Sequence, residues 1–86
     1  MIMEQIEEKI YEYINKDHDI RVNENILDDK LLVITFTDVF SNEVDRLSRK
    51  LMGIFGYSSY TPSQRKYVVF TSYKLVESFF TKNNLI

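Results

Sequence analysis

The pattern of apolar and polar positions predicts a unit in the middle of the chain around which the rest is built. Residues 31–36 are almost continuously apolar, which is typical of a strand buried on both faces. Residues 41–55 follow with apolar positions at helical spacing and with Ser41, or alternatively Asn42, as the N-cap. The inward positions of this helix are Val44, Leu47, Leu51, Ile54 and Phe55. We therefore expect a central strand that leads into a helix.

The same reasoning places the other elements. Helical spacing predicts helices near both ends of the chain, and alternation predicts short strands between them. The expected elements, in chain order, are a helix at 2–16, strands at 20–26 and 31–36, a helix at 41–55, strands at 57–60 and 66–71, and a helix at 73–82. Ser72 is the expected cap of the last helix. Residues 83–86 are expected to be a loose tail unless Leu85 and Ile86 dock.

This order predicts a single α+β domain over residues 1–86, with three helices and a four-stranded, mostly antiparallel sheet. The order α-β-β-α-β-β-α indicates a two-layer sandwich related to ferredoxin-like folds, in which the N-terminal hairpin supplies the fourth strand. The two apolar strands, 31–36 and 66–71, are expected in the middle of the sheet.

If all the helices cover one face of this sheet, its other face is left with an apolar patch. The alternative is that one helix crosses over to cover it. An exposed patch of this kind binds a partner or a second copy of the chain. Its expected members are Leu31, Val33, Tyr67 and Val69, next to Thr35 and Thr37.

Composition narrows the class of protein. The 86 residues contain no Cys, so neither disulfides nor thiolate metal sites can support the fold, and we expect a cytoplasmic protein. Glutamates interrupt the N-terminus before a signal peptide could form, and no apolar run has the length of a membrane span. Ala and Trp are absent while Ile, Lys, Asn, Tyr and Phe are plentiful. This bias is typical of AT-rich genomes, such as those of phages, viruses and mobile elements.

Charge is divided unevenly along the chain. Residues 1–45 hold twelve acidic and four basic side chains, whereas residues 46–86 hold one acidic and seven basic side chains. A small domain with an acidic half and a basic half would steer association with a charged partner.

Catalytic chemistry has little support in the sequence. His18 is the only histidine, and its place between two aspartates predicts a solvated turn rather than a metal ligand or a general base. The carboxylates of Glu4, Glu8 and Glu12 stand one helical turn apart, which is the pattern of a solvated helix face more often than of a cation site. We find no phosphate loop, nucleophile motif or cofactor motif. The sequence therefore predicts no enzyme, no cofactor and no metal.

Two binding modes remain, and both use the basic half. Cations could neutralise phosphates while tyrosines stack on bases, as in nucleic-acid binding. A protein partner would instead contact the uncovered sheet face and the middle helix, with Arg46, Arg49 and Lys50. For nucleic acid, Tyr60, Arg65, Lys66 and Tyr67 would join these three cations to hold phosphate and base.

Residues 30–82 resemble an RNA-recognition motif. Leu31–Phe36 corresponds to the first strand of that family, and Arg65–Phe70 corresponds to its aromatic third strand. The resemblance implies base stacking on Tyr67. Val69 stands where that family has a second stacking aromatic, and Lys66 and Val68 stand where it has Gly or Ala.

Residues 73–80 resemble the box by which proteins bind sliding clamps, because Phe79 and Phe80 follow an aliphatic residue at the spacing of that motif. The initial Gln of the box is replaced by Tyr73. A helix that packs against a core shows the same pattern, and we expect that alternative.

The interpretation that the sequence favours is a small non-catalytic binding protein, of the kind used by phages and viruses as regulators or inhibitors, that acts through protein–protein contact. Nucleic-acid binding by the basic, tyrosine-rich half is the alternative. A homodimer through the uncovered sheet face is compatible with either.

Overall fold

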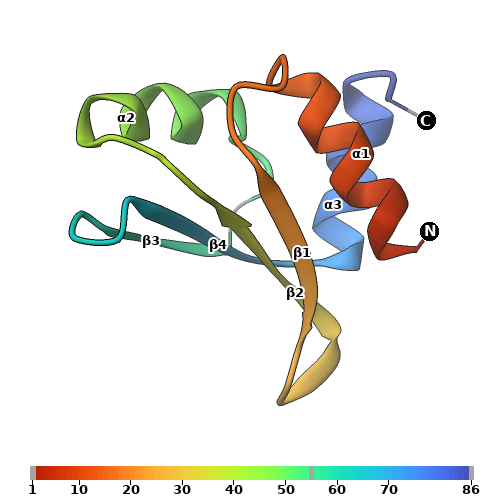
Figure 1. Cartoon of the computed structure of the whole chain (residues 1–86). Helices are drawn as coiled ribbons and strands as arrows, with labels where there is room; N and C mark the ends of the chain where they lie inside the picture. Colours follow the sequence, from red (N-terminus) through yellow and green to blue (C-terminus); the bar gives the residue numbers. More distant parts are fainter. Residues whose placement is uncertain (1, 55, 86) are drawn as a thin grey trace.

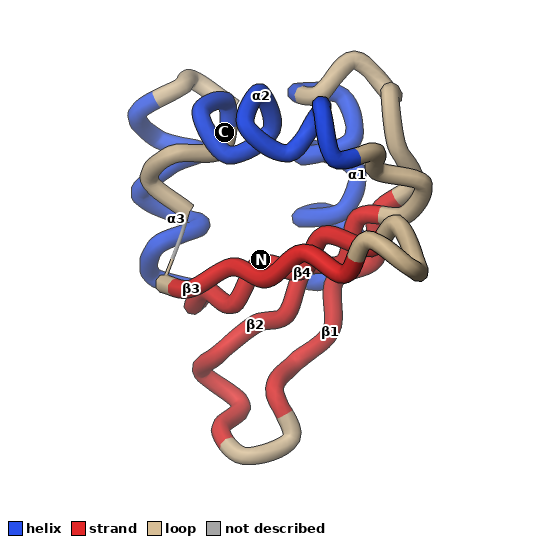
Figure 2. The backbone as a smooth tube through the Cα atoms, turned by 90° about the vertical axis from the view of Figure 1, so that its left-hand side faces the viewer, coloured by secondary structure: helices blue, strands red, loops and turns tan. Residues whose placement is uncertain are grey.

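Three helices cover one face of a four-stranded sheet in the computed structural model, which describes residues 2–54 and 56–85 (Figure 1). Turning the molecule by 90° shows the same two layers, with the helices on one side and the strands on the other (Figure 2). The elements are α1 (Met3–Tyr13), β1 (Ile20–Asn25), β2 (Asp28–Phe36), α2 (Ser41–Lys50), β3 (Tyr57–Thr61), β4 (Lys66–Ser72) and α3 (Tyr73–Lys82). The predicted order of elements and the predicted two-layer sandwich are confirmed.

The strands are ordered β1-β2-β4-β3, and every neighbouring pair is antiparallel. The two apolar strands, β2 and β4, therefore lie in the middle, as their composition predicts. Ile34 pairs with Val22 of β1 on one side and with Val69 of β4 on the other. β1 takes the place of the fourth strand of ferredoxin-like folds and enters from the N-terminal side.

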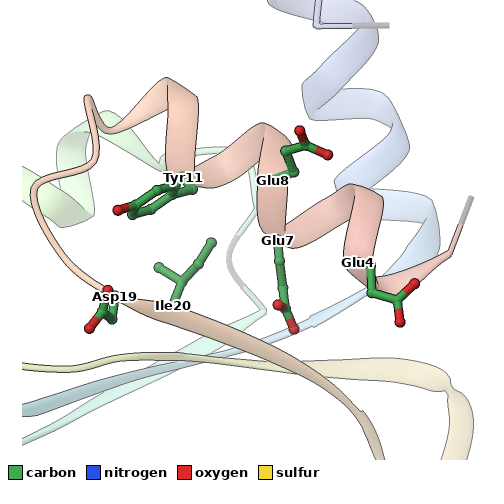
Figure 3. Close-up of a pocket in the computed structure, with 6 residues that line it drawn as sticks. All are labelled: Glu4, Glu7, Glu8, Tyr11, Asp19 and Ile20. Atoms are coloured by element: carbon green, nitrogen blue, oxygen red, sulfur yellow. The ribbon is translucent and has the colours of Figure 1, made fainter.

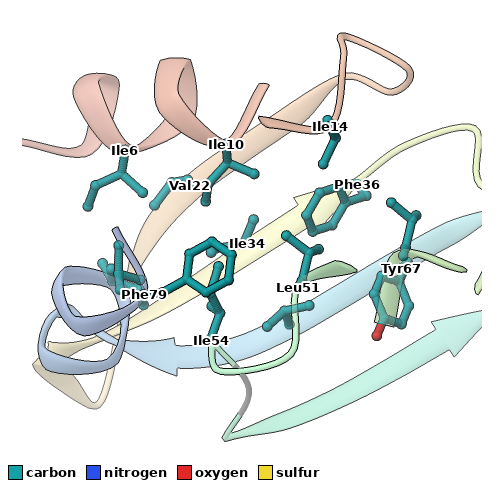
Figure 4. Packing of buried hydrophobic residues seen from close by; sticks show 14 of the residues in the cluster. Ile6, Ile10, Ile14, Val22, Ile34, Phe36, Leu51, Ile54, Tyr67 and Phe79 are labelled. Carbon is teal, nitrogen blue, oxygen red and sulfur yellow. The ribbon is translucent and has the colours of Figure 1, made fainter. Parts of the chain in front are cut away.

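The core lies between the sheet and the helices (Figure 4). α1 contributes Ile6 and Ile10, and the sheet contributes alternate residues of its central strands. Tyr13 and Phe79 meet edge to face with their ring centroids 5.3 Å apart, which joins the first helix to the last. The buried apolar side chains are Ile6, Ile10, Ile14, Val22, Leu32, Ile34, Phe36, Val39, Leu47, Leu51, Ile54, Tyr67, Val69, Val76, Phe79 and Phe80.

Several element boundaries differ from the prediction. α1 ends at Tyr13 rather than at residue 16, because Asn15 and Lys16 have φ near +60° and cannot continue a right-handed helix. β2 begins at Asp28, three residues earlier than expected. α2 ends at Lys50, and the glycine at position 53 follows it with φ of +110°. The predicted inward position of Phe55 and the docking of Ile86 lie outside the described residues.

The helix caps are partly as predicted. Ser72 caps α3 by accepting the amide N–H of Leu75 at 3.2 Å, as expected. The N-cap of α2 is Phe40 rather than Ser41 or Asn42. The amide N–H of Phe40 donates to Oε1 of Glu43 at 3.1 Å. The helix start is therefore capped by the side chain of Glu43, and the side chain of Phe40 forms no capping hydrogen bond. The tail docks at Leu85, whose amide N–H donates to the carbonyl of Phe80 at 2.8 Å.

His18 is buried, which corrects the expectation of a solvated turn. Its Nε2 lies 2.9 Å from Oε2 of Glu43, so the imidazole links the loop before β1 to the first turn of α2. Arg46 adds a second link, because its Nη2 lies 3.2 Å from Oδ2 of Asp17 and 3.8 Å from Glu43. The histidine is therefore a structural residue that helps to fix α2 over the sheet.

Matched truncations on adjacent residues of β2 test the two-layer arrangement. Ile34→Ala removes a side chain between the sheet and the helices and should lower the free energy of unfolding by about 2–5 kcal/mol. Val33→Ala removes a partly exposed side chain from the opposite face and should cost less than about 1 kcal/mol. Chemical denaturation of dilute samples measures both values, and equal losses would contradict one-sided coverage of the sheet.

The role of Glu43 is tested against a neighbouring carboxylate on the same helix. Glu43→Ala leaves His18 and the Phe40 amide without their acceptor, and we expect a loss of about 1–3 kcal/mol. Asp45→Ala removes only an exposed pair with Arg49, and we expect a loss of at most about 0.5 kcal/mol. Thermal or urea unfolding measures both losses. Equal losses for the two variants would show that the contacts of Glu43 with His18 and Phe40 do not stabilise the fold.

Candidate functional site

One face of the sheet lies away from the helices, and we call it the open face (Figures 1 and 2). Its centre is apolar. Strand pairing places Val33, Phe70 and Tyr57 side by side across β2, β4 and β3. The rings of Tyr57 and Phe70 are 5.7 Å apart, and Tyr57 is 66% exposed. Leu31 and Val68 extend this centre along the two middle strands. The helices lie on the other side of the sheet, so they do not cover these side chains.

The prediction for this face was right for β2 and wrong for β4. Leu31 and Val33 lie on the open face, but Tyr67 and Val69 point into the core and are 2% and 1% exposed. Val68 and Phe70 occupy the open face in their place. A shift by one residue exchanges the two faces of a strand, and β4 is apolar at four successive positions, so alternation gave no preference.

The rim of the open face is polar and carries few charges. Asn23 and Asn25 border it on β1, and Ser59 and Thr61 border it on β3, on the same side as the apolar centre by their pairing. Its cations, Arg21 and Lys66, lie toward the end of the sheet opposite the β1–β2 turn. An apolar centre with a polar, weakly charged rim is the usual anatomy of a protein–protein interface.

The β1–β2 hairpin projects away from the helices at one end of this face (Figures 1 and 2). Its tip consists of Ile26 and Leu27, which are 99% and 94% exposed. The turn is held by side-chain contacts, because Oδ1 of Asn25 accepts the amide N–H of Leu27 at 2.9 Å. Large aliphatic side chains are rarely left so exposed on an ordered turn, so this tip is a candidate contact point.

A hollow of about 300 Å³ lies beside the base of this hairpin. Its apolar lining comes from β2, β3, β4 and the first turn of α3, through Leu31, Tyr57, Phe70 and Leu75. We call this the apolar hollow. It adjoins the open face, since three of the four residues belong to both.

Tyr73 fastens the hairpin to α3. Its hydroxyl donates to Oε1 of Glu24 on β1 at 3.0 Å. The pKa of Tyr73 is raised above its usual value because burial disfavours the charged phenolate, because the hydroxyl donates to Glu24, and because Glu24 and Asp29 are negative. The neutral hydroxyl is therefore the form that the folded hairpin favours.

A second hollow, of about 430 Å³, lies between α1 and the start of β1 (Figure 3). Glu4, Glu7 and Glu8 line it from the helix, and Asp19 lines it from the strand side. Glu7 has a structural partner, because its Oε2 accepts the amide N–H of Val22 at 3.0 Å and so covers the edge of β1. Across the described residues, no group of His, Asp or Glu has the arrangement of a metal site.

The predicted cations of α2 are already engaged within the chain. Arg46 contacts Asp17, and Arg49 lies 3.0 Å from Asp45 one turn away. Lys50 stands over the ring of Tyr13, 5.5 Å from its centroid. All three lie in the helical layer, on the other side of the molecule from the open face.

The four predicted residues of the second hairpin are not brought together either. Tyr60 is half-buried and donates from its hydroxyl to the carbonyl of Val39 at 2.6 Å. Arg65 lies over the ring of Phe40, 5.1 Å from its centroid. Tyr67 points into the core and is 2% exposed. It therefore cannot stack on a base at the open face in the way that the resemblance to an RNA-recognition motif implies. Lys66 alone of the seven predicted residues faces the open side of the sheet.

The sequence contained a signal for the residues that were missed. Ile26 and Leu27 stand in a turn between Asn25 and Asp28, where polar residues are usual. Two adjacent aliphatic residues in such a turn are either buried by a neighbouring element or exposed for contact. Because the strand was predicted to extend to residue 26, Ile26 was not recognised as part of the turn.

Phe79 and Phe80 are buried, with 4% and 0% of their side chains exposed. The folded chain therefore cannot present them as a clamp-binding box, and α3 is the core helix that was expected.

Comparisons with known proteins add no relative. No protein-family model, curated protein or solved structure matches the chain. In the part of the chain that the structure describes, no helix has both the length and the apolar character needed to cross a membrane.

Alkaline titration tests the link between Tyr73 and the hairpin. Because the folded state raises the pKa of this hydroxyl, its contribution to stability is complete below about pH 10 and is lost as the pH rises through the folded pKa. The stability difference between the wild type and Tyr73→Phe should therefore shrink above about pH 10. Urea unfolding at pH 8 to 11 measures it, with Tyr57→Phe as the control; a constant difference would contradict the link.

Proposed function

We propose that the protein is a small non-catalytic binding protein that acts through protein–protein contact, with the open face of the sheet as its contact surface. The observation that carries the proposal is the apolar centre of this face, formed by Leu31, Val33, Tyr57, Val68 and Phe70. A patch of this kind on a folded chain is stabilised when a partner removes it from water.

The composition of the face favours a protein over a nucleic acid as the partner. Nucleic-acid surfaces track phosphates with several cations, whereas the open face has Arg21 and Lys66 at one end only. On α2, Arg46 and Arg49 are paired with acidic neighbours and Lys50 stands over the ring of Tyr13, and all three lie in the other layer. The alternative of nucleic-acid binding would therefore have to rely on a few separated cations.

The proposed role is that of a regulator or inhibitor that works by occupying a surface of another protein. The amino-acid composition supports an origin in a phage, a virus or another mobile element, and the absence of Cys supports a cytoplasmic setting.

A substitution in the centre of the open face tests the proposal. Val68→Glu places a charge among the apolar side chains, and Met52→Glu makes the same change at a 74% exposed position after α2. Proteins that co-purify with the tagged wild type from its native cell should be retained by Met52→Glu and reduced at least about tenfold by Val68→Glu, as quantified by mass spectrometry. Circular dichroism checks that both variants fold.

The same experiment has two contrary outcomes. Retention of the same partners by Val68→Glu would overturn the open face as the contact surface. Salt-sensitive binding to DNA that is lost when Arg65 and Lys66 are replaced by Glu would favour the alternative function.

A further inference from the structure

The apolar centre of the open face has the dimensions of a single helix. Leu31 and Val33 stand two residues apart on β2, and Val68 and Phe70 stand two residues apart on β4. Successive rows of side chains along these strands give the centre a length of about 14 Å, and the addition of Tyr57 on β3 gives it a width of about 10 Å. An α-helix is about 10–12 Å across with its side chains, and about nine of its residues cover 14 Å.

Polar side chains on both sides limit the width of the element that fits this centre. Asn23 pairs with Val33 on the β1 side, and Ser59 pairs with Val68 on the β3 side. A wider element would remove the amide and the hydroxyl from water and would have to supply hydrogen bonds for both. A single helix covers the apolar centre and leaves these two polar groups in contact with water.

The β1–β2 hairpin forms a wall at one end of the open face. It projects on the side away from the helices (Figures 1 and 2), and a hollow of about 470 Å³ lies against it. Val33 of the open face and Ile26 and Leu27 of the tip line this hollow. The turn is fixed in the free chain, because Oδ1 of Asp28 accepts the amide N–H of Lys30 at 2.9 Å in addition to the contact of Asn25 described above.

This wall disfavours a second sheet as the occupant of the face. The tip at Leu27 stands four residues beyond Leu31, which is up to roughly 13 Å of extended chain. Sheets that pack face to face are about 10 Å apart, so a second sheet would meet the projecting hairpin before it lay flat on the apolar centre. A helix is narrow enough to lie along the middle strands with one end beside the hairpin.

The other end of the open face carries unpaired positive charge. Arg21 pairs with Thr35 in the row of Val68, and Lys66 stands two residues further along β4. Both cations are exposed, and within the described residues neither forms an ion pair, either with Asp38 in the loop after β2 or with another carboxylate. Charge complementarity therefore favours an occupant that is acidic at this end.

We infer that the open face receives one amphipathic α-helix of the partner protein, which packs its apolar stripe on Val33, Val68 and Phe70 and places acidic side chains against Arg21 and Lys66. Such a helix has apolar residues at positions i, i+3, i+4 and i+7 and carboxylates about one turn beyond this stripe. The inference rests on the proposed function, because it names the structure and the charge of the segment that the open face contacts.

Selection from a phage-displayed library of random peptides of about 16 residues tests the inference, with the immobilised full chain as the target. Enriched peptides should have apolar residues at helical spacing and Asp or Glu at one end, and they should gain helicity on binding in circular dichroism. Val68→Glu should weaken their binding at least about tenfold. Met52→Glu, at a 74% exposed position outside the face, should leave the dissociation constant within about twofold of the wild type.

A charge swap tests the placement of the acidic end. Lys66→Glu should weaken the binding of an enriched peptide about three- to tenfold, because the reversal replaces an attraction by a repulsion. The same peptide with Lys in place of its Asp and Glu residues should bind Lys66→Glu more tightly than it binds the wild type. Lys82→Glu makes the same reversal at an exposed position in the helical layer and should leave both affinities within about twofold. Fluorescence anisotropy measures each dissociation constant.

Four results would overturn the inference. They are a selection without enrichment, enriched peptides with the two-residue alternation of a strand, peptides that bind Val68→Glu as well as the wild type, and peptides whose affinity Lys66→Glu leaves unchanged. The proposed function is read separately, by co-purification of cellular proteins with Val68→Glu and Met52→Glu. A partner that is lost with Val68→Glu but contacts the face through another kind of element would overturn the helix and leave the proposed function standing.

Discussion

The strand β2 imposes the constraint on which the rest of the structure depends. Its second half is apolar on both faces, so both faces gain free energy when they leave water. The three helices satisfy this requirement on one face only, through Leu32, Ile34 and Phe36. On the other face Leu31 and Val33 remain partly exposed. A fold of this length has one core, so the second apolar surface stays in contact with water and is the surface that the proposed partner would cover.

The uneven distribution of charge along the chain is partly offset in three dimensions at α2. Arg46 belongs to the basic half but contacts Asp17 of the acidic half, and Glu43 holds His18 while it caps the helix. The exposed pair of Arg46 and Asp17 contributes little, whereas the contact of Glu43 with the buried His18 is the stronger link between α2 and the loop before β1. Among the cations that the sequence offered for binding, Arg46 therefore links α2 to the loop before β1.

The fold could be predicted from the sequence because the signals for element type and order agree with one another. Alternation and helical spacing located every element, and the two apolar strands identified the centre of the sheet. The orientation of β4 could not be predicted, because Tyr67, Val68, Val69 and Phe70 fill both faces with side chains that suit burial. This single ambiguity moved the candidate site, since it decided which aromatic residue meets solvent.

The burial of His18 was beyond prediction for a different reason. Its partner Glu43 lies 25 residues away, and only tertiary packing brings the loop before β1 against α2. The exposed tip at Ile26 and Leu27 shows the reverse case, in which a local signal was present but Ile26 was assigned to the end of a strand. Local patterns therefore defined the elements, whereas contacts between distant segments decided which side chains were available for binding.

The two edges of the sheet show why association by the open face is favoured over association by strand addition. Glu7 occupies the amide of Val22 at the β1 edge, so a second strand cannot pair there without displacing it. The β3 edge is five residues long and mostly hydroxyl-bearing, with few apolar side chains to stabilise an added strand. Strand addition needs unoccupied backbone groups and apolar side chains at the same edge, and neither edge has both. The open face and the hairpin tip, in contrast, present large apolar side chains. The open face is therefore the surface on which the proposed binding depends.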